Sequence, residues 1–124
     1  MALKTGKKYY SKINYLKQSI KFNSLTGSKT NMFQYCKNNS REHELLKFAV
    51  FVYLIEKGYE VLCEPEFKDG GRADLIFFDI KGNGNIIEIL RTEAKESVTK
   101  KINYYPLDFE LHTLSTQNPT DITF

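Results

Sequence analysis

The segment from Ser40 to Gly58 constrains the fold of this chain most, because it is a helix-length apolar run with recognisable ends. Asn39, followed three residues later by Glu42, resembles a capping box, so a helix is expected to begin near Ser40. Lys57 suits the last turn of a helix, and Gly58 suits the position just after it. Apolar residues fill most of the run, so this helix must be covered on several sides, by a sheet and by the residues that precede it.

Strand-forming residues follow the helix in short blocks. The blocks span residues 59–67, 72–79 and 85–91, with glycine-rich turn signals at 69–71 and 81–84. Such short turns predict an antiparallel meander. A helical pattern over 93–104 then stops at Pro106, and a fourth strand is expected over 109–114, where a parallel crossover is permitted. The predicted fold is α/β, with a helix–strand–strand–strand–helix–strand core on a small mixed sheet.

Charge is distributed unevenly along the chain. Residues 1–41 contain nine Lys or Arg residues and no Asp or Glu, whereas the remainder carries nine basic and fifteen acidic residues. The first third therefore has a charge of +9 and the rest −6, an asymmetry that often marks a polyanion-binding arm. Tyr and Phe residues are interleaved with the lysines, and aromatic rings can stack on bases while Lys neutralises phosphates. The alternative is a solvated basic segment whose aromatic residues pack on the body of the protein.

The arm shows a weak helical pattern at Ile13, Leu16 and Ile20, so it is expected to be partly helical. The expected nucleic-acid contacts are Lys7, Lys8, Lys12, Lys17, Lys21 and Arg72. We divide the chain into an arm over 1–39, a core over 40–114 and a polar tail over 115–124.

Composition narrows the class of protein. The chain has 124 residues, 41% hydrophobic and 27% charged, which fits one folded domain. No apolar run approaches the length that spans a bilayer, and no signal peptide is visible, so we expect a cytoplasmic protein with no membrane partner. Cys36 and Cys63 lack the spacing of a zinc site and are expected to be reduced thiols.

Two acidic residues stand where strand interiors disfavour them. Asp74 and Glu88 are each flanked by apolar residues, and Glu44 heads the helical stripe that continues through Phe48 and Phe51. Burying a lone carboxylate is costly unless it is paired or binds a metal, and oxygen ligands suit Mg²⁺ or Mn²⁺. Each acid also has a structural explanation. Asp74 could pair with Arg72, Glu88 could face solvent, and Glu44 could favour the positive end of its helix.

The order of these elements and acids resembles the PD-(D/E)XK nuclease superfamily, which has the restriction-endonuclease-like fold and includes archaeal Holliday-junction resolvases. The resemblance covers roughly residues 40–114 and includes Gly-Gly-Arg-Ala-Asp, ending at Asp74, and Ile-Ile-Glu-Ile, centred on Glu88. It is similar to small archaeal or viral members. The resemblance implies a Mg²⁺- or Mn²⁺-dependent endonuclease that hydrolyses DNA, with branched or damaged DNA as candidate substrates. Asp74, Glu88 and Glu44 would be the catalytic metal ligands.

One position departs from that pattern, because Leu90 stands where the family has the lysine of Glu-x-Lys. The lysine has then either migrated, with Lys100 the chosen candidate beside Lys95 and Lys101, or been lost. Loss would leave a nuclease-fold protein that binds nucleic acid without cutting it. A small structural or interaction protein is a third alternative. Related resolvases act as two subunits, so a homodimer is also expected. For a viral member the expected location is the host cytoplasm.

His43 is expected on the surface of its helix and His112 on a strand, because the two histidines form no metal-binding spacing.

Overall fold

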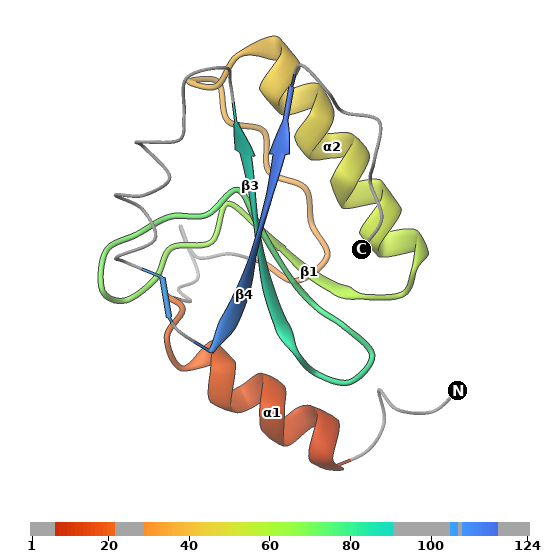
Figure 1. The fold of residues 1–124 in the computed structure, drawn as a ribbon, viewed down its shortest axis with the longest axis vertical. Helices are drawn as coiled ribbons and strands as arrows, with labels where there is room; N and C mark the ends of the chain where they lie inside the picture. Colours follow the sequence, from red (N-terminus) through yellow and green to blue (C-terminus); the bar gives the residue numbers. More distant parts are fainter. Residues whose placement is uncertain (1–6, 22–28, 91–104, 107, 117–124) are drawn as a thin grey trace.

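The computed structural model describes residues 7–21, 29–90, 105–106 and 108–116. These residues form two helices and one four-stranded sheet (Figure 1). The elements in chain order are α1 (Lys7–Lys17), α2 (Arg41–Glu56), β1 (Glu60–Cys63), β2 (Leu75–Phe78), β3 (Gly84–Leu90) and β4 (Phe109–Ser115). The strand order is β1-β2-β3-β4 in an open sheet.

The sheet is mixed. β1, β2 and β3 pair antiparallel as a meander, and β4 runs parallel to β3. The α/β class, the meander and the parallel fourth strand are therefore confirmed. The helix predicted over 93–104 lies outside the described residues.

The first strand is shorter than predicted. β1 ends at Cys63, which pairs with Leu75, rather than continuing to Phe67. Glu64 follows with a positive φ of 52°, and Pro65 comes next. A left-handed residue followed by a proline cannot continue a regular ladder, so the chain leaves the sheet at this point.

The ends of α2 explain its length. The N-cap is Ser40, whose hydroxyl accepts a hydrogen bond from the backbone N–H of His43 at 3.1 Å. The capping box predicted from Asn39 is therefore wrong. Asn39 instead donates its side-chain amide to Glu44. At the other end, Lys57 is the C-cap and Gly58 follows with φ at 82°, the left-handed conformation that glycine adopts without strain.

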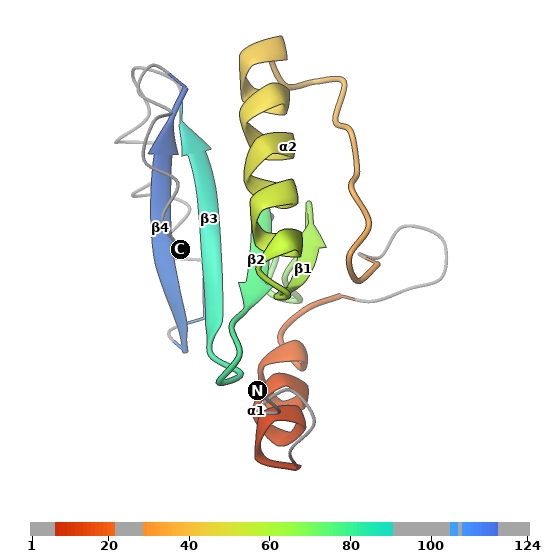
Figure 2. The same ribbon diagram turned by 90° about the vertical axis from the view of Figure 1, so that its right-hand side faces the viewer.

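Side chains alternate between the two faces of the sheet and build two apolar clusters. Leu75 and Phe77 of β2 pack with Val50 and Leu54 of α2. Ile76 and Phe78 point the other way and share a cluster with residues of α1. Figure 2 shows α2 lying along one side of the strands and α1 at their lower end. Each helix therefore covers a different part of the sheet.

The basic arm contributes to both clusters. α1 buries Tyr9, Ile13 and Leu16, so this helix belongs to the core and the predicted helical pattern is confirmed for Ile13 and Leu16. Ile20 is buried too, but it lies beyond the helix in a β-bridge to Phe67. The later part of the arm covers α2, because Phe33 makes edge-to-face ring contacts with Phe48 and Phe51. No helix within the described part of the chain is long and apolar enough to cross a membrane.

Candidate functional site

The acids singled out by sequence lie where the N-terminal end of α2 meets β2 and β3. Glu44 is in the first turn of α2, Asp74 immediately precedes β2, and Glu88 lies on β3. All three are buried, with exposed fractions of 6%, 8% and 1%. Two of the structural explanations are therefore wrong, because Glu88 does not face solvent and Arg72 pairs with Glu66 at 2.7 Å instead of with Asp74.

Asp74 is held by groups from α2 and β3. One carboxylate oxygen, Oδ1, lies 3.2 Å from Nε2 of His43, and the other accepts the backbone N–H of Ile89 at 2.7 Å. The Glu88 side chain also hydrogen-bonds Asp74. Burial alone would raise the pKa of Asp74, but the hydrogen bonds from His43 and Glu88 bring the pKa below its ordinary value.

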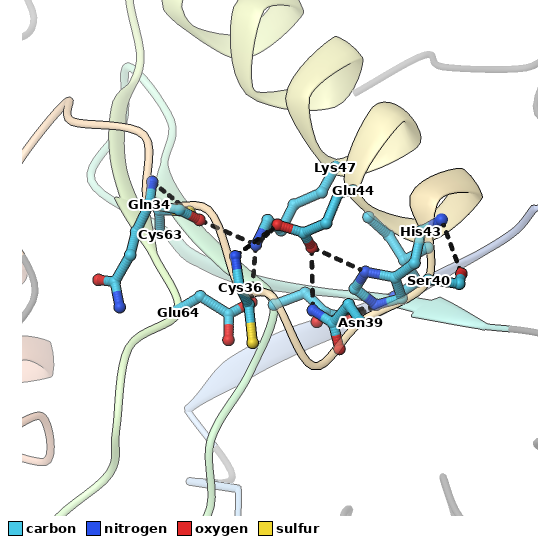
Figure 3. Close-up of polar contacts among 11 residues, drawn as sticks. Gln34, Cys36, Asn39, Ser40, His43, Glu44, Lys47, Cys63 and Glu64 are labelled. Atoms are coloured by element: carbon cyan, nitrogen blue, oxygen red, sulfur yellow. Dashed lines mark hydrogen bonds and ion pairs between the residues drawn. The ribbon is translucent and has the colours of Figure 1, made fainter.

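Glu44 accepts four hydrogen bonds or ion pairs (Figure 3). Its Oε1 accepts from the backbone N–H of Cys36 at 2.7 Å and pairs with Nζ of Lys47 at 2.9 Å. Its Oε2 lies 2.9 Å from the amide nitrogen of Asn39 and 3.2 Å from Nδ1 of His43. Burial would raise the pKa of Glu44, yet the N–H of Cys36 and the ammonium of Lys47 lower it overall.

His43 links the two acids instead of lying on the helix surface as predicted. Its two ring nitrogens face Glu44 and Asp74, and the side chain is only 10% exposed. Burial would lower the pKa of His43, but hydrogen bonds to Asp74 and Glu44 raise it above its ordinary value. The protonated ring, with a donor on each nitrogen, satisfies both carboxylates at once.

Lys47 is the main residue that sequence reasoning missed. It is fully buried, and its ammonium contacts Oε1 of Glu44 at 2.9 Å, Oε2 of Glu64 at 3.1 Å and the carbonyl oxygen of Gln34 at 3.0 Å. These are three acceptors for three N–H donors. The ammonium also lies 5.2 Å from the centre of the Phe33 ring. Burial would lower the pKa of Lys47, but the paired carboxylates raise it overall, so the charge is retained.

Glu64 is the fourth buried acid of the cluster. It is 7% exposed, its backbone is left-handed, and burial raises its pKa above the ordinary value. A non-glycine residue in this conformation costs free energy and is often found at functional sites. Both missed residues could have been recognised from the sequence. Lys47 interrupts an apolar run and Glu64 follows one, and apolar neighbours were the reason for selecting Asp74 and Glu88.

The predicted nucleic-acid contacts that the structure describes are not among the residues of this acid cluster. Lys95, Lys100 and Lys101 lie outside the described residues. Several predicted nucleic-acid contacts have acidic or polar partners: Lys17 with Glu60 at 2.5 Å, Lys21 with Glu66 at 3.9 Å, Arg72 with Glu66 at 2.7 Å and Lys12 with Asn83 at 2.8 Å. Lys7 and Lys8 are exposed on α1. The nucleic-acid role of these residues remains a prediction.

Metal binding requires a rearrangement of part of this cluster. Across the described ranges, no group of three or more His, Cys, Asp or Glu side chains is arranged to hold a metal ion. The reason is that His43 stands between Glu44 and Asp74, while Lys47 holds Glu44. The Asp74–Glu88 pair nevertheless fits Mg²⁺, which is commonly bound by one or two carboxylates together with water and substrate phosphate.

Comparisons of this chain with protein-family models, with curated proteins and with solved structures give no match. Its function must therefore be inferred from the geometry and chemistry of its own residues.

The contacts of His43 predict a pH-dependent stability. Because the folded state raises its pKa, the stabilisation by His43 is fully present below the unfolded value of about 6.5. It is lost as the pH rises through the folded pKa. The difference in unfolding free energy between wild type and His43→Gln should therefore be larger at pH 6 than at pH 9, measured by urea unfolding. In an Asp74→Asn background this pH dependence should shrink, and a pH-independent difference would contradict the ion pairing.

Proposed function

We propose that this protein is a Mg²⁺- or Mn²⁺-dependent endonuclease that hydrolyses DNA phosphodiester bonds, with branched or damaged DNA as candidate substrates. The main support is that acids from three different elements belong to one buried network. Asp74 and Glu88 are hydrogen-bonded to each other, and His43 connects Asp74 to Glu44. Burying this many carboxylates is costly for a purely structural cluster, whereas binding a cation would offset the cost.

The topology supports a restriction-endonuclease-like arrangement as part of this proposal. A helix precedes an antiparallel three-stranded meander, and the next strand in the sheet lies parallel to the third. This order agrees with the succession that the sequence resemblance implies, apart from the helix expected over 93–104, which lies outside the described residues. Glu44 lies on α2 and Glu88 on β3, and Asp74 immediately precedes β2 instead of lying on it.

In the proposed site, Asp74 and Glu88 would hold the metal ion. The ion would supply Lewis-acid activation of the phosphate and of a water molecule. The chain fixes the orientation of Asp74, because the N–H of Ile89 holds one carboxylate oxygen and His43 holds the other. Glu44 would join the metal site only by exchanging some of its present contacts, which include the ammonium of Lys47.

Lys47 acts in this proposal as a positioning residue. Its three donors are used by Glu44, Glu64 and the carbonyl of Gln34, so it neutralises two acids and orients them without facing a substrate. A cation that touches the phosphate would have to come from elsewhere, and Lys100 remains our candidate. Lys100→Ala should lower the cleavage rate without weakening metal binding.

A nucleic-acid-binding protein without nuclease activity is the second candidate. It is favoured by Leu90 in the motif lysine position and by the saturated donors of Lys47. Under this alternative the acid network stabilises the fold, and binding depends on α1.

Cleavage assays separate the two candidates. Purified protein would be incubated with single-stranded, duplex and four-way-junction DNA in Mg²⁺, Mn²⁺ or EDTA. The Asp74→Asn/Glu88→Gln double variant, purified identically, controls for contaminating nucleases. Cutting that needs metal and is absent from the double variant is the expected result. Salt-sensitive binding without cutting on these substrates would favour the second candidate.

A further inference from the structure

A hollow lies beside α1, at the end of the sheet where β3 and β4 begin. Its volume is about 390 Å³, within the range of sites that hold small ligands. It is lined by Lys12, Tyr15, Leu16, Asn83, Gly84 and Asp108. A second hollow of about 240 Å³ shares Tyr15, Leu16 and Asp108. Tyr15 therefore borders both, and we call the combined feature the Tyr15 groove.

The floor of the Tyr15 groove is apolar and closely packed. A Cβ atom added at Gly84 would lie 2.7 Å from the Phe109 ring and 3.0 Å from Leu16, so only glycine allows these side chains to approach β3. Leu16 and Phe109 are both buried, at 8% and 9% exposure. Because core packing fixes the positions of these side chains, the groove is expected to keep its shape when no ligand is bound.

The rim of the groove combines a ring, a cation and hydrogen-bonding groups. The Tyr15 side chain is 61% exposed, although α1 buries its other large apolar residues except Tyr10. Lys12 donates to the side-chain oxygen of Asn83 at 2.8 Å, which brings an ammonium to the edge of the hollow. Asp108 adds an exposed carboxylate that can accept hydrogen bonds.

The helix beside the groove is basic, although the lining itself contributes one positive side chain, Lys12, and one negative one, Asp108. Residues 7–21 contain five lysines and no acidic residue. Lys17 and Lys21 are paired with glutamates, whereas Lys7, Lys8 and Lys12 are exposed and form no ion pair within the described residues. A ligand here should therefore carry phosphate charge and a flat apolar face.

We propose that the Tyr15 groove binds an unpaired base of single-stranded nucleic acid. The Tyr15 ring would stack on the base, Lys12 would neutralise the adjacent phosphate, and Asn83 and Asp108 would meet the Watson–Crick edge. Only an unpaired base offers both its face and that edge, because a duplex hides them. The inference rests on the nucleic-acid binding in the proposed function and names its substrate class, which is nucleic acid with unpaired nucleotides.

In Figure 1, α1 lies at the end of the sheet where β3 begins and the first turn of α2 lies at the other end, so the groove beside α1 and the acid cluster are at opposite ends of β3. Gly84, Ile86 and Glu88 alternate onto the same face of this strand, and four residues of β-strand span about 13 Å. Successive bases of a stacked strand are about 3.4 Å apart. If the rest of the strand kept this stacked spacing, the phosphates near Asp74 and Glu88 would lie about four nucleotides from the base bound at Tyr15.

Fluorescence anisotropy in EDTA tests the inference without cleavage. The probes are a labelled single-stranded 12-mer, a fully paired hairpin and an abasic 12-mer that keeps the phosphates but lacks bases. Tyr15→Ala should weaken binding of the base-containing single strand by about 5- to 150-fold, the range expected for losing one stacked base. It should leave the abasic strand unchanged. Circular dichroism would verify that each variant is folded.

Tyr10→Ala is the matched control, because Tyr10 is on the same helix, is 49% exposed and does not line the groove. It should change affinity by less than about twofold. Equal losses for Tyr10→Ala and Tyr15→Ala, or equal effects on the base-containing and abasic strands, would overturn the inference. So would an unchanged affinity of Tyr15→Ala, which would leave a different ligand, such as an apolar peptide, for the groove.

These outcomes are separable from those of the cleavage assay. Tyr15-dependent binding without metal-dependent cutting would contradict the nuclease proposal and support the base-binding site. Metal-dependent cutting with binding that does not depend on Tyr15 would support the nuclease proposal and contradict the base-binding site. An absence of nucleic-acid binding would contradict both.

Discussion

Replacing Lys47 with Met is expected to lower the free energy of unfolding by about 3–5 kcal/mol, the cost of removing one partner from a buried ion pair. Methionine keeps much of the length of the side chain but removes the charge that balances Glu44 and Glu64. It also leaves the buried carbonyl of Gln34 without its ammonium donor. Urea unfolding followed by circular dichroism would measure the change at pH 7.

Two further variants make this prediction specific to the ion pairs. Lys57→Met removes an exposed lysine at the end of the same helix and should cost less than about 1 kcal/mol. The triple variant Lys47→Met/Glu44→Gln/Glu64→Gln should recover part of the lost stability, because no uncompensated charge is left buried. A loss below 1 kcal/mol in Lys47→Met would show that the cluster tolerates its unpaired acids.

Much of the fold was predictable because local signals agree with the packing. The apolar run before Gly58 predicted α2, and the glycine-rich turns predicted the order and direction of the strands. The prediction of the helix start was wrong because one side chain could form either of two kinds of hydrogen bond. Asn39 has the chemistry of a helix cap, but it binds Glu44 while Ser40 caps the helix. β1 ends early because the backbone of Glu64 is left-handed, and the residue type of Glu64 does not reveal this conformation.

The candidate site was only partly predictable. Acids in apolar strands stand out, so Asp74 and Glu88 could be selected from sequence, and Glu44 followed from its helical stripe. Their counter-charges were harder to recognise, because lysine is usually exposed and histidine is intermediate in burial. Lys47 lies against residues that come well before α2 in the chain, because its ammonium is close to the Phe33 ring and donates to the Gln34 carbonyl. Such long-range contacts leave no periodic pattern in the sequence.

Asp74→Asn is expected to reduce metal-dependent DNA cleavage by at least about 10²-fold, comparable with losing one preorganised electrostatic group in an active site. Asparagine is similar in size, and its side-chain oxygen can still accept from the N–H of Ile89, so the local backbone should be preserved. It cannot supply the charge that a divalent ion requires beside Glu88. Initial cleavage rates would be measured across a Mn²⁺ titration.

Binding and a matched variant distinguish a lost metal ligand from a damaged fold. Asp69→Asn removes the same charge from an exposed turn and should leave cleavage within about twofold of wild type. DNA affinity of Asp74→Asn in EDTA should be equal to or higher than that of wild type, because a negative charge is removed without loss of the basic surface of α1. Cleavage retained by Asp74→Asn would contradict its role as a metal ligand. A parallel loss of binding and cleavage would instead assign Asp74 to the stability of the fold, through its contacts with His43 and Ile89.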